Sequence, residues 1–345
     1  MGTARLLAVT VTVIAVVAGP SVVAAAATPV APARGSSSPS LVPGTPPAPT
    51  ATTATVPTFP APARPGGSVV WSPQGRAALG RPLLYTGSAG GAFLAWMDPE
   101  LTRPVVVPGA GDTPSSPWGG QVAPERRPFL LASFNGGFEW NDSNGGVLAF
   151  GATYKPVVAG LASLIVYADG TFDVGLWGRD TDPAKPVVAA RQNLDLLVDG
   201  GRPTAAVSGN VRAWGASVAG PATMRSAVGV DGNGALLWAG GRLTPADLAN
   251  TLVVAGAVRA MELDINPDWV NFNSYDVAPD GSATGNGLFG ATGANRYLRP
   301  DPRDFVAVMV RGTIAPGASA KLGRGPVRGS VRAHEGAPSR ATAPS

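Results

Sequence analysis

The chain of 345 residues contains no cysteine and a single histidine, His334, and these two absences exclude several kinds of chemistry. Without cysteine there is no disulfide, no lipidated cysteine and no thiolate metal site. Because His334 lies in a low-complexity C-terminal tract, the rest of the chain has no histidine for a Ser-His-Asp or Cys-His nucleophile or for a His-rich metal site. An enzyme built from this chain must therefore use Asp, Glu, Arg, Asn, Tyr or Ser.

An excess of basic charge is also missing from the central part of the chain. The formal net charge is +4, but residues 1–67 carry three Arg and no acid, and residues 316–345 carry five basic residues and one acid. Residues 68–315 keep 18 basic and 21 acidic side chains, which is a net charge of −3. Basic ends suit attachment to anionic envelope polymer, whereas a folded reader of nucleic acid shows a basic face. We therefore expect no nucleic-acid partner.

The two ends of the chain have compositions typical of segments outside a folded domain. Residues 1–27 combine Arg5, an apolar run and a small-residue cleavage site, which predicts a signal peptide. Residues 28–67 are rich in Pro, Ala and Thr and predict a disordered linker, and residues 316–345 predict a disordered basic tail. One domain is left, over 68–315, in a protein that we expect to be secreted, extracellular or associated with the cell envelope. A membrane is expected as a partner only if the apolar run stays uncleaved and spans the bilayer.

Strand patterns dominate the predicted domain. β-Rich runs flank Asp169-Gly170 and the turn from Asp231 to Gly234, which predicts hairpins at 164–177 and 226–240. Further strands are predicted at 69–73, 82–87, 92–97, 129–137, 146–152, 194–200, 259–265 and 304–312.

One helix is predicted at about 245–255. Thr244 is its N-cap, Pro245 takes the first helical position, Asp247 completes a pattern like a capping box and Gly256 follows its end. The predicted fold class is α+β, with a large mixed or antiparallel sheet and few helices in a single domain.

The first candidate motif is "SFNGGFEW", residues 133–140. A strand runs into Asn135, Gly136 and Gly137, where two adjacent glycines permit positive φ and close approach of the backbone to another group. A simple turn is the commoner role of Asn-Gly. The functional interpretation makes Asn135 an amide that holds a ligand and makes the glycines exposed N–H donors.

Arginine and carboxylates supply the second candidate set. Arg225 begins an apolar strand, where it is either a solvated or ion-paired structural residue or a bidentate partner for phosphate or carboxylate. Glu262 and Asp264 alternate with Met261 and Leu263, so we expect the two acids to share one strand face. Such a pair raises the proton affinity of each member and suits acid/base chemistry, while a solvent-facing edge strand is the structural alternative.

The polar end of the same stretch adds Asp268 and Trp269. Asp264, Asn266 and Asp268 match the opening of a calcium loop, but Trp269 stands where an EF-hand requires Gly, so an EF-hand is excluded. A looser oxygen-ligand calcium site is left open, and we assign no metal and no cofactor. Trp269 and Trp140 are candidates to stack on a sugar ring, with core packing as the alternative.

The order of these motifs resembles the phosphodiester glycosidase family, the relatives of the N-acetylglucosamine-1-phosphodiester α-N-acetylglucosaminidase known as the uncovering enzyme. The resemblance covers about residues 125–310 and rests on "FNGGF", then "LLVDGG", then "MRSAVGVDGNG", a short helix and "MELD". It implies that Asn135, Gly136, Gly137, Arg225 and Asp264 occupy family motif positions.

The chain departs from this family after Asp264. The family has Gly-Gly-Gly-Ser there, whereas this chain has Ile265-Asn266-Pro267-Asp268, and Glu262 replaces the usual Asn. Ile and Pro make the loop stiffer and leave fewer N–H donors for phosphate. The change predicts a site that is retuned to another glycoside or retired from catalysis.

Three functions follow from the sequence. The leading hypothesis is a secreted hydrolase that cleaves sugar-1-phosphodiester or related glycosidic linkages in envelope or extracellular polysaccharide. Asp264, Glu262 and Arg225 are its predicted catalytic residues, and Asn135, Gly136, Gly137, Asp268 and Trp269 are predicted to bind the substrate. The alternatives are a non-catalytic saccharide-binding or wall-associated module that uses the same pocket, and a structural exoprotein. The expected partner is a carbohydrate or sugar-phosphate polymer.

Overall fold

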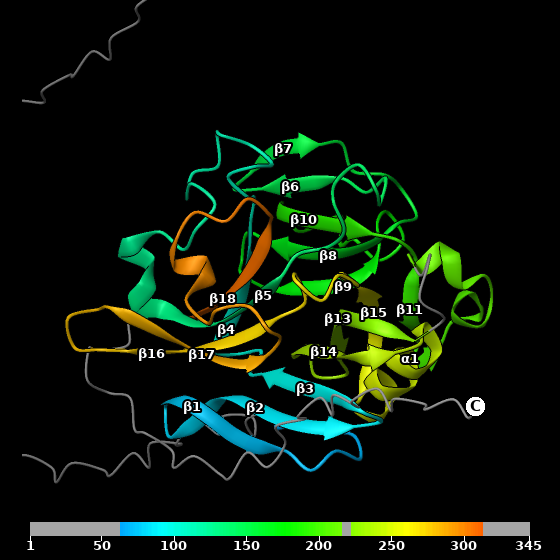
Figure 1. Ribbon diagram of the computed structural model, residues 1–345, viewed down its shortest axis with the longest axis horizontal. Coiled ribbons are helices and arrows are strands. Elements are labelled where there is room, and N and C mark those ends of the chain that lie inside the picture. Colours follow the sequence, from blue (N-terminus) through cyan, green and yellow to red (C-terminus); the bar gives the residue numbers. More distant parts are fainter. Residues whose placement is uncertain (1–62, 216–221, 313–345) are drawn as a thin grey trace, which may run out of the picture. The chain divides into compact units, whose positions relative to one another are not determined.

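Short apolar runs separated by Gly-containing turns give this chain a structure made mostly of β-strands (Figure 1). The structure is a computed structural model that describes residues 63–215 and 222–312, all within one compact unit. The predicted signal peptide and basic tail lie outside the described residues, and so does the predicted linker up to residue 62. Ala63, near the end of that linker, packs against apolar residues of the domain.

Three sheets contain the eighteen strands of the described residues. The eight-stranded sheet has the order β1 (Ser72–Ala78), β2 (Arg81–Ala89), β3 (Ala92–Met97), β14 (Leu236–Leu243), β13 (Thr223–Asp231), β15 (Ala257–Glu262), β11 (Leu196–Asp199) and β12 (Arg202–Pro203). One five-stranded sheet has the order β7 (Ala152–Lys155), β6 (Val147–Ala149), β10 (Val187–Asn193), β8 (Ala162–Tyr167) and β9 (Phe172–Leu176). The other has the order β17 (Ala283–Phe289), β16 (Phe272–Val277), β5 (Leu130–Asn135), β18 (Phe305–Val310) and β4 (Thr102–Val107).

The strand pairs of all three sheets are antiparallel. Helices are few among the described residues: α1 (Pro245–Val254) and the 3-10 helices η1 (Pro124–Phe129), η2 (Ala205–Ser208), η3 (Val211–Trp214) and η4 (Arg296–Leu298). The predicted α+β class is therefore confirmed, with the strands divided among three sheets instead of gathered in one. Within the described part of the chain, no helix is long and apolar enough to cross a membrane.

Both predicted hairpins are present, as β8–β9 and β13–β14, because the Gly-containing turns between them determine the pairing. The first strand was predicted too early, at 69–73, and β4, β7, β10, β12, β16 and β17 were missed. Strand β10 ends in Arg191, Gln192 and Asn193, which are all fully buried, and a search for apolar alternation does not detect such a strand. Strand β4 carries Pro104, which is tolerated because β4 is an edge strand.

The predicted helix is α1, and its ends follow from the sequence. The Thr244 hydroxyl accepts a hydrogen bond from the N–H of Asp247, whose carboxylate accepts one from the N–H of Thr244 in return. Gly256 follows the end with a φ of 96°, which suits glycine best. Because β13 pairs antiparallel with both β14 and β15, the helix joins two parallel strands that flank β13.

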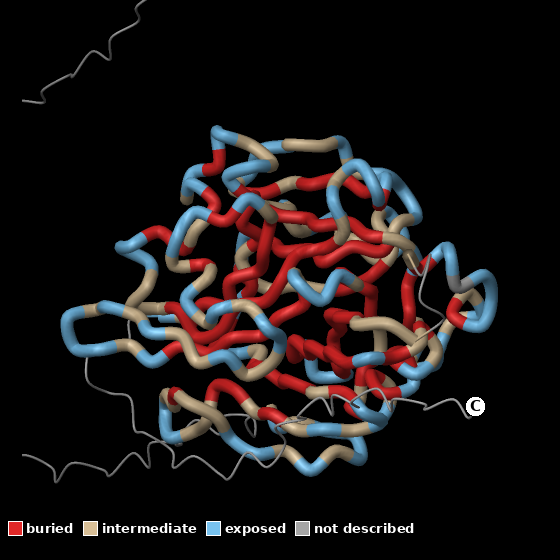
Figure 2. Tube along the Cα trace, in the orientation of Figure 1, coloured by how far each residue is buried: buried red, intermediate tan, exposed pale blue. Residues whose placement is uncertain are grey.

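Two large apolar clusters lie on opposite faces of the eight-stranded sheet. Along β13, Ala227 belongs to the cluster under α1, and Val228 belongs to the cluster that also contains side chains of the two five-stranded sheets. The buried segments in Figure 2 run through the strands of all three sheets, while the exposed segments lie in the connecting loops. This packing places the ends of β5 and β15 and the start of β18 near one another, where the candidate site is found.

We predict that Thr244→Ala lowers the free energy of unfolding by about 1 kcal/mol, because it leaves an N–H group of the first helical turn without its acceptor. Urea unfolding measures the change. Thr153→Ala, which alters an exposed threonine on β7, is the control and should change stability by less than about 0.5 kcal/mol. Equal effects of the two substitutions would contradict the role of the cap.

Candidate active site

A cleft of about 390 Å³ opens where three loops meet. The loops follow β5, surround η3 and follow β15, and a side chain just before β18 completes the lining. The lining residues are Phe138, Glu139, Asp142, Leu194, Arg212, Ala213, Gly215, Asp264, Ile265, Asn266, Trp269 and Arg303. Acids, arginines and aromatic rings thus share one cleft, a composition suited to a polar ligand with an anionic group.

Asp264 is the most buried acid of this cleft, with 4% of its surface exposed. Its Oδ1 accepts hydrogen bonds from the backbone N–H groups of Ile265 (2.7 Å) and Asn266 (2.9 Å), and its Oδ2 lies 3.4 Å from Nη2 of Arg303. Burial raises the pKa of Asp264 to about 6, although these N–H groups and the Arg303 guanidinium oppose the shift. A carboxyl group held in this way both gains and loses a proton near neutral pH.

Arg303 connects the two sides of the cleft. Besides Asp264, its guanidinium contacts Oε1 of Glu139 through Nη1 (3.1 Å) and the carbonyl of Gly137 through Nη2 (3.2 Å). Its Cζ lies 4.9 Å from the ring centroid of Trp269, and Cζ of Arg296 lies 4.3 Å from the same centroid. Trp269 therefore stacks against two cations of the protein, so it supports Arg303 and is not a free platform for a sugar ring.

Asp268, beside Trp269, is exposed and does not line the cleft. Its backbone carbonyl accepts a hydrogen bond from Nη1 of Arg296 (2.9 Å), and its N–H donates to Oδ1 of Asn266 (3.0 Å). The contacts of Asp268 therefore stabilise the loop after β15.

Glu262 and Arg225 form a separate, fully buried ion pair. Nη1 of Arg225 donates to Oε1 of Glu262 (2.5 Å) and to the carbonyl of Trp214 (2.8 Å), and neither ionic side chain lines the cleft. Burial raises the pKa of Glu262 to about 7, opposed by Arg225 and aided slightly by the charge of Asp264. Two interpretations of Arg225 were left open, a structural ion-paired residue and a partner for a phosphate or carboxylate ligand. In the structure Arg225 is ion-paired with Glu262.

The predicted pairing of Glu262 with Asp264 on one strand face needs correction. Strand β15 ends at Glu262, and the chain then turns around the Asp264 side chain, so strand alternation does not extend to this residue. Asp264 consequently faces the cleft, whereas Glu262 faces the interior beside Arg225.

Asn135 lies behind the cleft and uses both of its amide hydrogens within the protein. Nδ2 donates to Oγ of Ser226 (2.9 Å) and to the carbonyl of Gly136 (2.9 Å), and Oδ1 accepts from the N–H of Asn271 (3.2 Å). Ser226 also bonds to the backbone of Asp264 through its own N–H (2.9 Å). Asn135 thus connects β5 to β13 and, through Ser226, to the loop that carries Asp264.

Gly136 and Gly137 are buried, and they allow close packing instead of exposing N–H donors. Neither has a positive φ. A Cβ atom on Gly136 would lie 2.1 Å from Oδ2 of Asp304, and one on Gly137 would lie 3.1 Å from Cζ of Arg191. The N–H of Gly136 donates to the carbonyl of Asp304 (3.0 Å), so this donor is already used.

Arg191 and Asp304 form a bidentate ion pair whose side chains are each 1% exposed. Nε of Arg191 lies 2.7 Å and Nη2 lies 3.2 Å from the two carboxylate oxygens. The same Nη2 also donates to the carbonyl of Phe138, and Nε1 of Trp140 donates to Asp304 (3.3 Å). The ion pair therefore holds the Asn-Gly-Gly-Phe turn in place, and Trp140 packs behind the turn and does not line the cleft.

The predicted residues fall into three groups. Asp264 and Trp269 line the cleft, Arg225, Glu262, Asn135 and the two glycines form its buried support, and the exposed Asp268 lies outside it. The sequence analysis missed Arg303, Glu139, Arg212 and the Arg191–Asp304 pair. Glu139 lies inside the quoted motif, and Arg303-Asp304 stands directly before the apolar strand β18.

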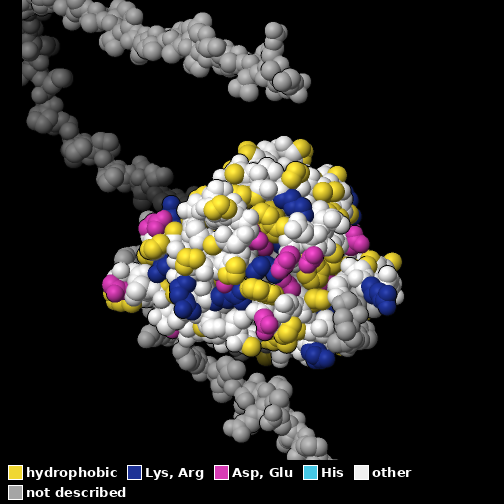
Figure 3. Space-filling model, turned by 45° about the horizontal axis from the view of Figure 1, so that its top comes forward, with side chains coloured by type: hydrophobic (Ala, Val, Ile, Leu, Met, Phe, Trp, Pro, Cys, Tyr) yellow, Lys and Arg dark blue, Asp and Glu magenta, His cyan; other side chains and the backbone are white. Residues whose placement is uncertain are grey.

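Charges of both signs are mixed near this site. On the face shown in Figure 3, basic and acidic side chains lie side by side near the centre with hydrophobic side chains next to them. Among residues 63–215 and 222–312, no group of three or more acidic or histidine side chains is arranged to hold a metal ion.

Comparisons with known proteins give distant likenesses only. No protein-family model matches the chain, and no curated protein matches it. Among solved structures, the chain is similar to the catalytic domain of zebrafish N-acetylglucosamine-1-phosphodiester α-N-acetylglucosaminidase, auto-inhibited by its pro-peptide, with 16% identity and a TM-score of 0.44 over 71% of this chain and 89% of that one. A hypothetical protein from Synechocystis has 14% identity and a TM-score of 0.33 (71% and 62% covered), and an exported protein from Burkholderia pseudomallei has 10% and 0.35 (66% and 75% covered).

We predict that Asp304→Asn lowers the free energy of unfolding by about 3–5 kcal/mol, because it leaves the buried Arg191 guanidinium without a counter-charge. Denaturant unfolding at pH 7 tests the prediction, and Asp195→Asn, at an exposed position, is the control. A loss below about 1 kcal/mol, the size typical of exposed ion pairs, would show that the pair does not organise the turn.

We predict that Asp264→Asn, unlike Asp304→Asn, raises the free energy of unfolding at pH 7. Because the folded-state pKa is raised from 3.8 to about 6, the stabilising effect of the bound proton is fully present below pH 3.8 and is lost as the pH rises through about 6. Asn cannot ionise and its Oδ1 can still accept from Ile265 and Asn266. The variant should therefore be more stable than the wild type at pH 7, by up to about 3 kcal/mol, with the difference vanishing near pH 4. Unfolding curves at both pH values measure it, and a less stable variant at pH 7 would contradict it.

Proposed function

We propose that this protein is a secreted hydrolase that cleaves a sugar-1-phosphodiester or a related glycosidic linkage in envelope or extracellular polysaccharide. The observation that carries the proposal is Asp264, a nearly buried carboxyl group at the cleft whose pKa is raised to about 6 next to Arg303. A pKa near the working pH is what a group needs in order to donate a proton in one step and accept it in another.

Asp264 is the general acid or base of the proposed reaction. Cleavage of a glycosidic bond requires a proton on the leaving oxygen and a nucleophile at the sugar carbon, and a pair of carboxyl groups commonly supplies both. The bonds from Ile265 and Asn266 fix Oδ1, so Oδ2 is the oxygen directed toward Arg303 and available for proton transfer.

Glu139 is the second carboxylate of the proposal. Its side chain is 63% exposed and contacts the same guanidinium as Asp264, so the two acids stand on either side of Arg303. Glu139 is exposed to solvent at the cleft, where it activates a water molecule or acts as the nucleophile. The sequence suggested Glu262 as a catalytic carboxylate, but Glu262 is buried in an ion pair with Arg225. This pair supports the strands from which Asp264 extends.

Arg303 and Arg212 are the anion-binding residues of the proposal. Arg303 is held on the ring of Trp269, and Arg212 is exposed at the cleft, so two guanidinium groups can face one phosphate. Phe138 and Ile265 add apolar surface beside them. A sugar with a phosphodiester on its anomeric carbon has both the anionic and the apolar surfaces that this cleft accommodates.

We predict that Asp264→Asn lowers the rate of hydrolysis of synthetic sugar-1-phosphodiesters by about 10²-fold or more, because proton transfer contributes that much to catalysis. The wild-type kcat/KM should also change with pH around a midpoint near 6, and this transition should be absent in the variant. Release of reducing sugar by the full secreted chain is the assay, and Asp280→Asn, in the exposed turn between β16 and β17, is the control.

Three outcomes separate the alternatives. Hydrolysis that survives in Asp264→Asn would overturn the assignment of this residue. Saturable binding of saccharide without turnover in the wild type would replace the hydrolase with the saccharide-binding module considered from the sequence. Neither binding nor turnover on any sugar phosphodiester would overturn the proposed substrate class.

A further inference from the structure

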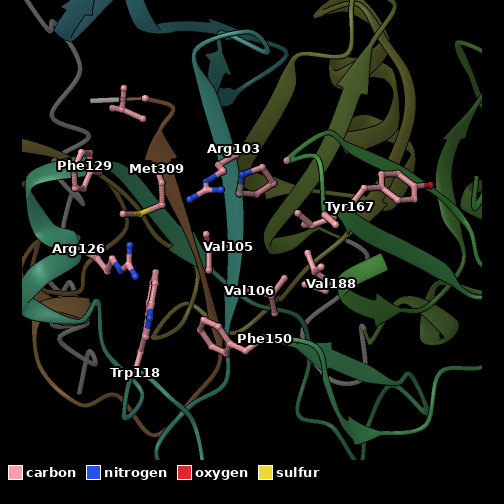
Figure 4. A pocket seen from close by; sticks show the side chains of 17 residues that line it. Arg103, Val105, Val106, Trp118, Arg126, Phe129, Phe150, Tyr167, Val188 and Met309 are labelled. Atoms are coloured by element: carbon pink, nitrogen blue, oxygen red, sulfur yellow. The ribbon is translucent and has the colours of Figure 1, made fainter. Parts of the chain in front are cut away.

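A second cavity, of about 440 Å³, lies away from the residues of the candidate active site and shares none of its lining with it. It opens between the edge strand β4 and strands β8 and β10 of the neighbouring sheet, with η1 at its rim (Figure 4). Apolar side chains dominate the lining, including Val105, Val106, Trp118, Phe150, Val188 and Met309. The volume falls in the range of sites for small molecules.

Two arginines face this apolar space. In Figure 4, the guanidinium groups of Arg103, from β4, and Arg126, from η1, point toward each other across the cavity, while Trp118 and Phe150 lie at another end. Both arginines are exposed, and neither has an ion pair within the described residues. Burial lowers the pKa of Arg311, the nearby charge of Arg103 lowers it further, and Asp169 opposes the shift. Among the described residues, the two arginines of the lining therefore face the cavity without an ion pair of their own.

The described residues that line the cavity supply no negative charge, and the acid of η1 beside Arg126 is Glu125. None of the lining residues, all of which are described, is acidic, and the nearby Asp169 is paired with Lys185 at 3.2 Å. The residues outside the described part contain a single acidic side chain, Glu335. Arg103 and Arg126 are therefore available to pair with an acidic group of another molecule.

We propose that this cavity binds a single-chain amphiphile with an acidic head group, a long-chain carboxylate or alkyl phosphate. The head group pairs with Arg103 and Arg126, and the hydrocarbon chain packs against Trp118, Phe150 and the valines of β4. Each buried methylene contributes about 0.8 kcal/mol, so a chain provides affinity that an inorganic anion cannot reach at an exposed pair of arginines. This site is independent of the proposed hydrolytic cleft.

Calorimetric titration of the full chain below the critical micelle concentration tests the proposal. Dodecanoate and dodecyl phosphate are the probes, dodecanol and dodecyltrimethylammonium have the same chain without the negative charge, and inorganic phosphate has the charge without the chain. We expect saturable binding of one dodecanoate or dodecyl phosphate per chain, at least about tenfold weaker binding of dodecanol, and no binding of the cation or of phosphate at the same concentrations.

Variants locate the binding. Arg103→Gln combined with Arg126→Gln should weaken dodecanoate binding at least about tenfold with unchanged folding, because both side chains are exposed. Arg242→Gln, at an exposed arginine of β14 outside the cavity, is the matched control. Val188→Phe, which fills the cavity and leaves the charges in place, should weaken binding of the chain as well.

Several results would overturn the proposal. They are equal binding of dodecanol or of the cation, and dodecanoate binding that is unchanged in both the double arginine variant and Val188→Phe. Association with anionic phospholipid vesicles without saturable binding of dodecanoate would show that the arginines face a membrane surface and that the cavity has no ligand.

Discussion

The buried ion pair between Arg191 and Asp304 is the constraint on which the candidate site depends. Arg191 belongs to β10 in one five-stranded sheet and Asp304 directly precedes β18 in the other, so the pair joins two sheets through their interior. Gly136 has to be glycine because Asp304 occupies the space of a side chain there, and Gly137 packs closely against the guanidinium of Arg191. Two charges in a dry interior are stable only when their hydrogen bonds are nearly complete, and the carbonyls of Phe138 in the turn and Gln192 in β10 supply the remaining acceptors.

Asp304 and Asp264 are two acids of similar burial with different surroundings. Asp304 receives a bidentate guanidinium and an indole N–H, whereas Asp264 receives two backbone N–H groups and a longer contact to Arg303. The first set of contacts serves the fold, because it holds the ion pair that organises the turn. The second leaves the pKa of Asp264 raised, which lowers stability at neutral pH and keeps a proton available at the cleft.

Local chemistry made part of this structure predictable. The helix with Thr244 and Asp247 at its start, and the hairpins with their Gly turns, depend on neighbours in sequence, and all are present. Strand β10 was missed because its buried Arg191, Gln192 and Asn193 resemble an exposed loop until their distant partners are known.

Only part of the candidate site was predictable from the sequence. Asp264 and Trp269 were recognised because a polar run interrupts an apolar strand. Arg303 was not, since it is far along the chain from Asp264 and only tertiary packing brings the two together. Glu262 was predicted to share a strand face with Asp264 because strand alternation was extended past the end of β15. The strand ends at Glu262, and the chain then turns around the side chain of Asp264.

Pro104, in the edge strand β4, has a consequence for the behaviour of the protein in concentrated solution. β4 pairs with β18 on one side only, and proline has no N–H, so its nitrogen must face the free side of the strand. The ladder at this edge is therefore interrupted at its third residue, next to the charged side chain of Arg103. A strand of another molecule cannot add to such an edge in a continuous register, which protects a sheet-rich chain against aggregation.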